Sequence, residues 1–379
     1  MSLNNGMLSQ IIIKGFKSIK QCDIKFGKTN VLIGCNGAGK SNFISAFSLL
    51  QDILLKNLQL SVARSGLNSM LYLGRKHTDE ICFEAFFGDN SYGFELTATD
   101  DNRLVFKKEF LGTPVNPDNE PIISREGASS LIKKDFANGN SESFWDNELN
   151  KTISTNVISI LEKQNWRVYH FHDTGRSSKI KQEHNVSNNK LLMPDAGNLA
   201  AFLYRLKNSY TKSYNEIIKT IQLIAPYFSD FVLEPEELNP EHIILKWSQK
   251  GCDDVFNASQ LSDGTLRFIC LATLLLQPEE LRPATIILDE PELGLHPFAI
   301  TILSELIKGL SDETQAIIST QSVELLNEFD VEDIIVVDRG ENGSEFKRLN
   351  RDELIEWLDE DYSLGELWQK NLLGGRFSR

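Results

Sequence analysis

Residues 34–41 read Gly-Cys-Asn-Gly-Ala-Gly-Lys-Ser, which fits the phosphate-binding loop pattern of glycine, four residues, glycine, lysine and serine. Such a loop joins a buried strand to a helix, because its backbone N–H groups and the positive helix end must face the phosphates. The apolar residues 31–33 precede it, and residues 43–54 carry apolar side chains at helical spacing. The pattern therefore predicts an α/β fold organised around a strand, this loop and a helix.

The loop residues predict a site for ATP and Mg²⁺. Lys40 is expected to reach the β- and γ-phosphates, and the hydroxyl of Ser41 is expected to bind Mg²⁺. The glycines allow the backbone to approach a triphosphate closely. The alternative is a glycine-rich turn between a strand and a helix that holds no ligand. The expected nucleotide contacts are Gly34, Asn36, Gly37, Ala38, Gly39, Lys40, Ser41 and Asn42.

A second apolar run, residues 284–288, ends in two adjacent carboxylates. We expect a buried strand here, with Asp289 in the Mg²⁺ shell as in other phosphate-loop enzymes. Glu290 is then placed to orient or deprotonate the attacking water, which makes it the candidate catalytic base. The alternative is a strand whose acidic end only meets solvent.

Residues 261–265 read Leu-Ser-Asp-Gly-Thr and precede an almost wholly apolar stretch at 266–276, which predicts a buried helix. Ser262 and Gly264 at the start of this helix provide a second place for an anion. The alternative is an ordinary N-cap made by Ser262 or Asp263. The two roles are compatible.

These motifs, in this order, resemble the ABC-type ATPases of the SMC, RecF and OLD group. Residues 13–19, Ile-Lys-Gly-Phe-Lys-Ser-Ile, resemble the opening strand of that group, and residues 290–297, Glu-Pro-Glu-Leu-Gly-Leu-His-Pro, resemble its Walker B and D-loop. Residues 166–174 and 362–368 are similar to a bacterial subgroup of stand-alone ATPases of the anti-phage-system type. The resemblance is strongest at 247–298, and residues 113–151 match no family that we can name.

The resemblance implies the head fold of an ABC-type P-loop NTPase, with a strand-rich first lobe and a short helical insertion instead of a long coiled coil. It also implies an ATP-dependent homodimer or higher oligomer, in which two chains sandwich two nucleotides. In that arrangement Ser262 and Gly264 of one subunit cap the γ-phosphate bound by the other subunit.

One position departs from the group. The strand predicted at 316–318 is followed by Gln321, where the group usually has a switch histidine that touches the γ-phosphate. Glutamine can hold a water or a phosphate oxygen but does not take up charge near neutral pH. Gln321, a candidate catalytic residue, therefore favours slow ATP hydrolysis, and a protein that acts as a switch more than as a motor. The Q-loop glutamine cannot be placed, and Gln164 and Gln182 are weak candidates for it.

The periodicity of apolar residues and the positions of loop-forming residues predict four segments of the chain. Residues 1–112 form lobe I, 113–245 an insertion with a short helical stub, 246–350 lobe II, and 351–379 a helical tail. Within the insertion, 113–150 predicts a loop or lid, while 153–162 and 198–224 predict helices. Strands are expected at 334–337 and 346–349, followed by a helix capped by Asn350 with Glu353 three residues later. The apolar residues of the tail either fold back onto the core or form a docking surface.

The charge is unevenly distributed. Residues 311–361 hold sixteen acidic against four basic residues, which accounts for −12 of the formal net charge of −14. This balance argues against indiscriminate DNA coating, and the acidic region more readily meets a partner protein. Five lysines in the first thirty residues leave room for a local basic face, or for a merely solvated strand edge. That face is made of Lys14, Lys17, Lys20, Lys25 and Lys28, to which Arg64, Arg75 and Lys76 can add.

Other features set limits. No run of eighteen apolar residues and no signal-peptide pattern is visible, so we expect a cytoplasmic protein without membrane contact. The five cysteines show no metal or disulfide spacing. His170 and His172 alternate on a predicted strand beside Asp173, which suggests either a metal site or packing residues near the nucleotide, since a third ligand is not evident.

Two functions follow from these expectations. The favoured one is a Mg²⁺-dependent ATPase that acts as a dimeric switch, senses or grips DNA, and regulates a separately encoded nuclease or toprim effector in anti-phage defence. The alternative is a RecF-like ATPase of DNA repair or chromosome maintenance. A transporter cassette fits the D-loop and opening strand poorly, and the chain itself carries no recognisable nuclease motif.

Overall fold

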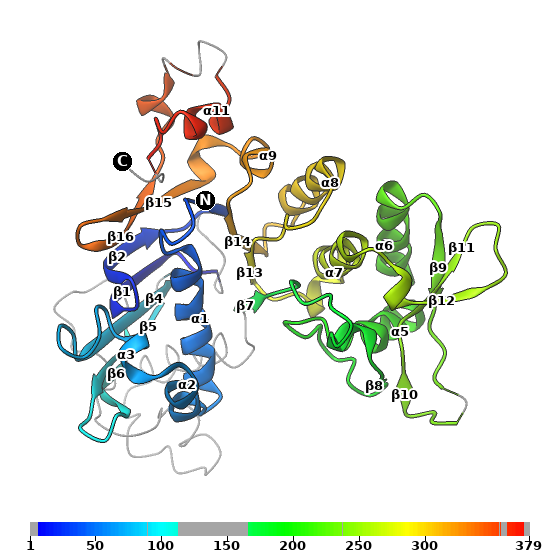
Figure 1. Ribbon diagram of the computed structural model, residues 1–379, viewed down its shortest axis with the longest axis horizontal. Helices are drawn as coiled ribbons and strands as arrows, with labels where there is room; N and C mark the ends of the chain where they lie inside the picture. Colours follow the sequence, from blue (N-terminus) through cyan, green and yellow to red (C-terminus); the bar gives the residue numbers. More distant parts are fainter. Residues whose placement is uncertain are drawn as a thin grey trace. The chain divides into compact units, whose positions relative to one another are not determined.

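The computed structural model describes residues 7–88, 90–112, 166–236, 238–355, 357 and 362–374. Its chain divides into two compact units (Figure 1). Unit 1 comprises residues 1–167, 283–285 and 330–379, and unit 2 comprises 168–282 and 286–329. The lid predicted at 113–150, the helix predicted at 153–162 and Gln164 lie outside the described residues. The boundaries of the four predicted ranges stay a prediction.

Unit 1 contains a five-stranded antiparallel sheet with the strand order β2-β1-β4-β5-β6. Alternate residues of β4 are buried, as expected for a strand with one face on a core. On that face the rings of Phe83 and Phe94 stack with their centroids 5.1 Å apart. The strand-rich first lobe is therefore confirmed. The strands are β1 (Gln10–Phe16), β2 (Ile19–Lys25), β4 (Glu80–Phe87), β5 (Asn90–Ala98) and β6 (Leu104–Gly112).

The strand before the phosphate loop, β3 (Thr29–Ile33), pairs in parallel with β15 (Ile334–Gly340). β15 in turn pairs antiparallel with β16 (Gly343–Arg348), so segments about 300 residues apart in the sequence lie side by side next to the strand that leads into the loop. The helix that follows the loop is α1 (Lys40–Leu54), whose fully buried Phe43 packs against the rings of Phe47 and Phe346. Two short helices follow, α2 (Leu58–Ser65) and α3 (Leu67–Met70).

The tail belongs to unit 1. Helix α11 (Leu364–Gln369) is capped by Ser363, and its Leu367 is fully buried, while Trp368 is only 7% exposed. The described part of the tail therefore folds back onto the core. Asn350 caps a 3-10 turn, Arg351–Glu353, and Ile355 and Trp357 beyond it are α-helical, so a helical segment follows Asn350 as predicted but begins as a 3-10 turn. Residues 358–361 lie outside the described part.

Three strands with residues in unit 2 follow the order β14-β13-β7, namely β14 (Gln315–Thr320), β13 (Thr285–Asp289) and β7 (Trp166–Tyr169). β13 and β14 are buried along almost their whole length, as strands covered on both faces are. The helices α7 (Asp263–Leu276), α8 (Pro297–Lys308) and α9 (Val323–Leu326) alternate with these strands along the chain. α7 and α8 contact each other, and Ala272 and Ala299 belong to one buried cluster.

The predicted helical stub is present as two helices, α5 (Leu199–Ser209) and α6 (Thr211–Ile224), which contact each other (Figure 1). α6 also contacts α7, which ties the stub to the rest of unit 2. Five short strands complete the unit, forming the pairs β8–β10 and the sheet β12-β11-β9. They are β8 (His184–Asn185), β9 (Phe228–Val232), β10 (His242–Ile243), β11 (Lys246–Gln249) and β12 (Val255–Asn257). Across the described ranges, no helix combines the length and apolarity needed to cross a membrane.

Candidate active site

The phosphate loop lies in unit 1 between β3 and α1, as predicted. Its lysine, Lys40, is only 4% exposed, and the ammonium group donates hydrogen bonds to the carbonyl oxygens of Gly34 at 2.6 Å and Cys35 at 3.2 Å. The charge is therefore held inside the curve of its own loop, while Asn36 and Gly37 are exposed at the tip. A buried ammonium group needs such partners, because desolvation without them is costly.

The start of α1 suits an anion. The N-cap is Gly39, with φ of 122°, and no side chain caps the first N–H groups of the helix. These groups and the Lys40 ammonium are the donors that a phosphate requires. Gly37, with φ of 82°, has open space where a Cβ would stand. A triphosphate therefore fits the residues of this loop.

Two serines anchor the loop from outside its motif. The hydroxyl of Ser344 in β16 donates to the carbonyl oxygen of Ala38 at 2.6 Å and shares a second hydrogen bond, 2.7 Å long, with the hydroxyl of Ser18. Ser18 also accepts from the side-chain amide of Asn42 at 2.8 Å. A Cβ on Gly39 would lie 2.0 Å from the Ser344 oxygen, so only glycine fits there. Ser18 lies in the opening motif, but nothing in the sequence pattern points to Ser344.

The predicted carboxylates lie in unit 2, at the end of β13. Asp289 accepts a hydrogen bond from the Ser319 hydroxyl, and Glu290 accepts one from the side-chain amide of Gln321. The two residues predicted to be catalytic, Glu290 and Gln321, are thus in direct contact. Glu290 has a φ of 44° and donates its backbone N–H to the Ser319 carbonyl at 2.9 Å. A left-handed conformation is uncommon outside glycine and often marks a functional position.

Glu292 is a third carboxylate that the motif analysis did not single out. Its Oε1 accepts from the Thr320 hydroxyl at 2.5 Å and from the backbone N–H of Gln321 at 3.3 Å. Its Oε2 is buried and has no hydrogen-bond partner among the described residues. Burial raises the pKa of Glu292 above its ordinary value, and the hydrogen bond from Thr320 only partly opposes this shift. The D-loop pattern contains this residue, but burial could not be deduced from it.

The signature segment forms the start of α7. Ser262 is exposed and caps the helix, accepting from the backbone N–H of Thr265 at 3.1 Å. A Cβ on Gly264 would lie 2.4 Å from the carbonyl oxygen of Gly294, so the signature packs tightly on the D-loop. Arg267 strengthens this contact by donating to the Leu293 carbonyl at 2.7 Å. The N-cap reading of Ser262 is confirmed, and its role toward a nucleotide stays a prediction.

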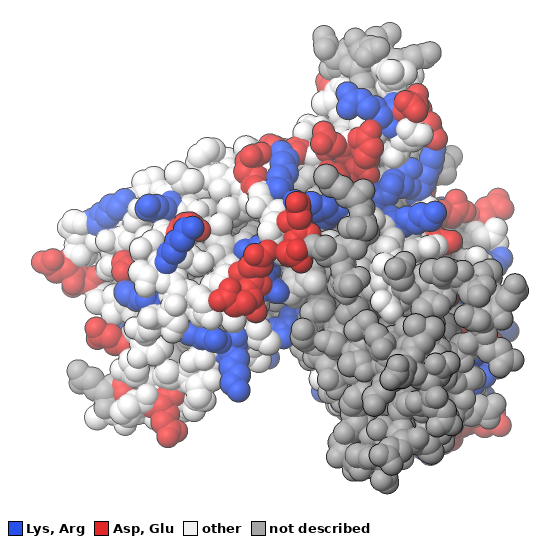
Figure 2. Space-filling view, turned by 180° about the vertical axis from the view of Figure 1, so that it is seen from behind, with Lys and Arg blue, Asp and Glu red and all other residues white. Residues whose placement is uncertain are grey.

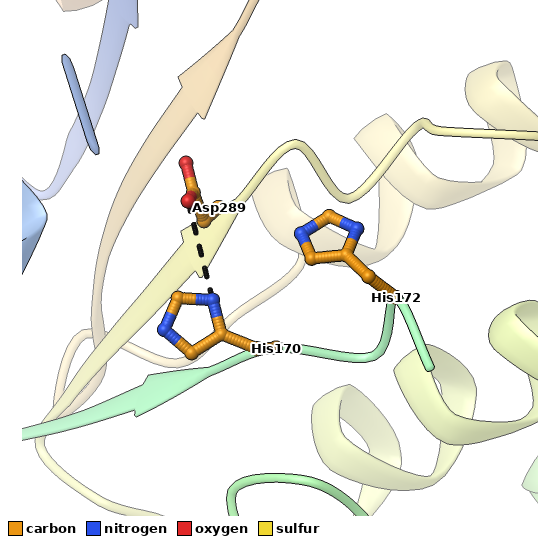
Figure 3. A group of neighbouring side chains, drawn as sticks. All are labelled: His170, His172 and Asp289. Carbon is orange, nitrogen blue, oxygen red and sulfur yellow. Dashed lines mark ion pairs between the residues drawn. The ribbon is translucent and has the colours of Figure 1, made fainter. Parts of the chain in front are cut away.

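His170 and His172 are grouped with Asp289 in unit 2 (Figure 3). Their ligand atoms all lie within 4.8 Å of one another, and Nδ1 of His170 is 4.0 Å from Oδ2 of Asp289. The third member of the group is therefore Asp289 and not Asp173, which accepts from the backbone N–H of Gly175 in a local turn. The expected strand face is also wrong, because β7 ends at Tyr169. Burial lowers the pKa of His170, an effect that Asp289 opposes.

The Q-loop candidate Gln182 is exposed and donates to the Ser177 carbonyl at 2.8 Å. No contact ties it to the carboxylates of β13 in the described part of the chain. Its assignment as a nucleotide residue gains no support from this position.

Comparison with known families agrees with this geometry. Residues 29–327 match the AAA_21 family, described as "AAA domain, putative AbiEii toxin, Type IV TA system". The chain belongs to this AAA_21 family. The matched range contains the phosphate loop, the signature, both carboxylates at the end of β13 and Gln321, and so includes every predicted site residue. The ATPase domain is of the ABC type.

Solved structures show that this AAA_21 chain has the fold of an SMC head. It resembles the "SmcHead bound to the C-winged helix domain of ScpA" with a TM-score of 0.58 at 18% identity, covering 92% of this chain and 99% of that one. The Smc head of Pyrococcus furiosus, bound to the C-terminal domain of ScpA, gives 0.58 at 16% identity, covering 93% and 99%. The SMC-head fold predicted from the motifs is confirmed.

A sequence relative is the structural maintenance of chromosomes protein 3 of Arabidopsis thaliana. It is 31% identical over 105 residues, which are 27% of this chain. The chain spans only 8% of that relative's length.

The raised pKa of Glu292 predicts how stability depends on pH. The folded state binds the Glu292 proton more tightly than the unfolded state, so this residue costs nothing at acidic pH and destabilises the fold as pH rises through its folded pKa. Glu292→Gln should therefore gain stability relative to the parent between pH 4 and pH 8, measured as the midpoint of urea unfolding.

Glu324→Gln is the matched control with the opposite sign. Hydrogen bonds from its own backbone N–H and from Ser322 lower the pKa of Glu324, so its ionised form stabilises the fold. This variant should lose stability relative to the parent over the same pH range. A difference for Glu292→Gln that stays flat with pH would contradict the assignment of a costly buried carboxylate.

Proposed function

We propose that this protein is a Mg²⁺-dependent ATPase that works as a dimeric switch. The observation that carries the proposal is the phosphate loop, with an uncapped helix start and a buried ammonium group held within hydrogen-bond distance of the loop carbonyls. Bound Mg²⁺ supplies charge neutralisation between the phosphates. Lys40 and the N–H groups of α1 bind the β- and γ-phosphates, while Ser41 and Asp289 hold the cation. The remaining contacts come from the loop residues Gly34, Asn36, Gly37, Ala38, Gly39 and Asn42.

Hydrolysis in this proposal depends on Glu290 and Gln321. Glu290 orients the attacking water and accepts its proton, and the Gln321 amide fixes the direction of the Glu290 carboxylate through the hydrogen bond described above. Gln321 is a positioning residue as long as it donates to Glu290. Because this amide carries no charge that could follow the γ-phosphate, turnover is slow and the ATP-bound state lasts.

Dimerisation supplies the second half of each site. Ser262 is exposed at the start of α7, so it is available to the nucleotide of another copy of the chain. The close contact between Gly264 and the Gly294 carbonyl holds this surface rigid. We assign Ser262 and Gly264 to the γ-phosphate bound by the partner.

The output of the switch is a separately encoded effector, a nuclease or toprim protein, in a cytoplasmic anti-phage system. Two comparisons support a partner protein: the family description names a type IV toxin–antitoxin system, and both similar SMC heads are bound to ScpA. The alternative is a RecF-like role in DNA repair or chromosome maintenance, which the fold accommodates equally.

DNA is the proposed trigger. Lys14 of β1 and Lys25 of β2 are exposed on antiparallel strands, with Asp23 between them on β2. On the face drawn in Figure 2, basic and acidic side chains are interspersed over the described surface, which suits gripping at a few points better than coating. In this proposal the acidic region 311–361 contacts the partner protein and not DNA.

Two substitutions separate binding from hydrolysis. Lys40→Ala should abolish ATP binding, because it removes the cation aimed at the β- and γ-phosphates. Glu290→Gln should keep binding and lower the hydrolysis rate by about 10²–10⁴, the usual contribution of a general base. A fluorescent ATP analogue measures the first effect and phosphate release the second. Lys56→Ala, an exposed lysine just after α1, is the control and should change neither. Normal ATP affinity in Lys40→Ala would reject the site.

Mixed dimers test the composite site. Neither Lys40→Ala nor Ser262→Arg should hydrolyse ATP alone, yet their mixture should regain activity, since one site of each heterodimer combines an intact loop with an intact signature. The control is a mixture of Lys40→Ala with the double variant Lys40→Ala/Ser262→Arg. No chain in this mixture has an intact phosphate loop, so it should stay inactive. Mixtures of the single variants that remain inactive would contradict the dimer.

DNA binding is tested through its salt dependence. Lys14→Glu/Lys25→Glu should weaken binding to duplex DNA and reduce the slope of log K against log salt by about 2, one for each lost phosphate contact. The control Lys212→Glu/Lys219→Glu reverses two exposed charges on α6 and should leave the slope unchanged. If both double variants and the parent gave the same slope of log K against log salt, the proposal that Lys14 and Lys25 contact DNA would be rejected.

A further inference from the structure

We propose that His170, His172 and Asp289 form a binding site for a divalent transition-metal ion of the Mn²⁺, Co²⁺ or Zn²⁺ class. The site goes beyond the proposed ATPase function, because its three ligands lie in unit 2 and it needs neither nucleotide nor Lys40.

The geometry of the group is that of an open metal site. Figure 3 shows the imidazoles of His170 and His172 on the segment after β7, and the carboxylate of Asp289 at the end of β13. The ligand atoms lie within 4.8 Å of one another, and the two ring centroids are 6.2 Å apart. Around one ion with bonds of about 2.0–2.2 Å, ligand atoms stand roughly 3–4 Å apart. Small ring rotations therefore close the site.

Contacts outside the group hold its backbone in place. Arg267 of α7 donates to the carbonyl oxygen of His172 at 2.9 Å, and the backbone N–H of His170 donates to the Pro194 carbonyl at 3.0 Å. The Ser319 hydroxyl donates to Oδ1 of Asp289, so Oδ2 faces His170. Metal sites use such outer partners to orient their ligands.

Access and burial are balanced. The side chain of His170 is 45% exposed, so an ion and its remaining waters can reach the group, whereas that of Asp289 is only 14% exposed. Partial burial of the carboxylate strengthens its attraction to a cation, because less water screens it. Electrostatics and access thus both favour an ion here.

The ligand chemistry selects the class of metal. Two imidazole nitrogens and one carboxylate oxygen suit first-row transition ions, whereas Mg²⁺ prefers an all-oxygen octahedral shell. Affinity should rise from Mn²⁺ to Co²⁺ along the Irving–Williams order. Since Asp289 is also the carboxylate assigned to Mg²⁺, a transition ion and Mg²⁺ are alternatives at this residue.

The test is titration of the full-length, nucleotide-free protein with Co²⁺, followed by calorimetry and visible absorption. One ion should bind per chain, and His170→Ala, His172→Ala and Asp289→Asn should each weaken the affinity about tenfold or more, since losing even an outer partner of a ligand costs 10–100-fold. His77→Ala, an exposed histidine of unit 1, is the control and should bind as the parent does. Circular dichroism checks that each variant is folded, and His172→Gln replaces His172→Ala should that variant unfold.

Co²⁺ binding that is absent in the parent, or unchanged in His170→Ala/His172→Ala, would overturn the proposal. Its failure is distinct from failure of the ATPase assignment. Lys40→Ala should lose ATP but keep Co²⁺, so unchanged ATP affinity in that variant rejects the nucleotide site alone, and absent Co²⁺ binding rejects the metal site alone.

Discussion

Three carboxylates, those of Asp289, Glu290 and Glu292, lie close together at the end of β13 and just after it, and keeping them together is the constraint on which the site depends. Three consecutive residues at the end of β14 meet this constraint: Ser319 donates to Asp289, Thr320 to Glu292 and Gln321 to Glu290. Like charges this close repel one another, and hydrogen-bond donors offset part of that cost. Each of the three acids thus has its own donor from the end of β14 or the residue after it, and Gln321 is the donor that orients Glu290.

Gln321 stands where the resemblance to the SMC, RecF and OLD group predicts a histidine. A neutral amide can donate to Glu290 without adding a charge that competes with a bound cation. The imidazole of His170 comes instead from the segment after β7, and its Nδ1 lies 4.0 Å from Oδ2 of Asp289. Neutral donors and an imidazole therefore reach the acids from different elements.

The sequence predicts which strands and helices flank the loop, the carboxylates and the signature, because each motif occupies a few consecutive residues. The strand before the loop and α1 after it follow from local apolar spacing. The contacts that complete these motifs join distant segments and leave no local pattern. Ser344 lies 306 residues from the Ala38 carbonyl it binds, and His170 meets an aspartate far along the chain. The burial of Glu292 likewise depends on tertiary packing, which the local pattern does not reveal.

Arg267 makes the signature helix part of a mechanical linkage. One guanidinium grips the backbone of the D-loop at Leu293 and the backbone beside the histidines at His172. A Cβ on Gly264 would lie 2.4 Å from the Gly294 carbonyl oxygen, so the start of α7 also packs directly on the D-loop. A single side chain thus links the signature helix to two separate backbone segments, and replacing Arg267 would remove both links at once.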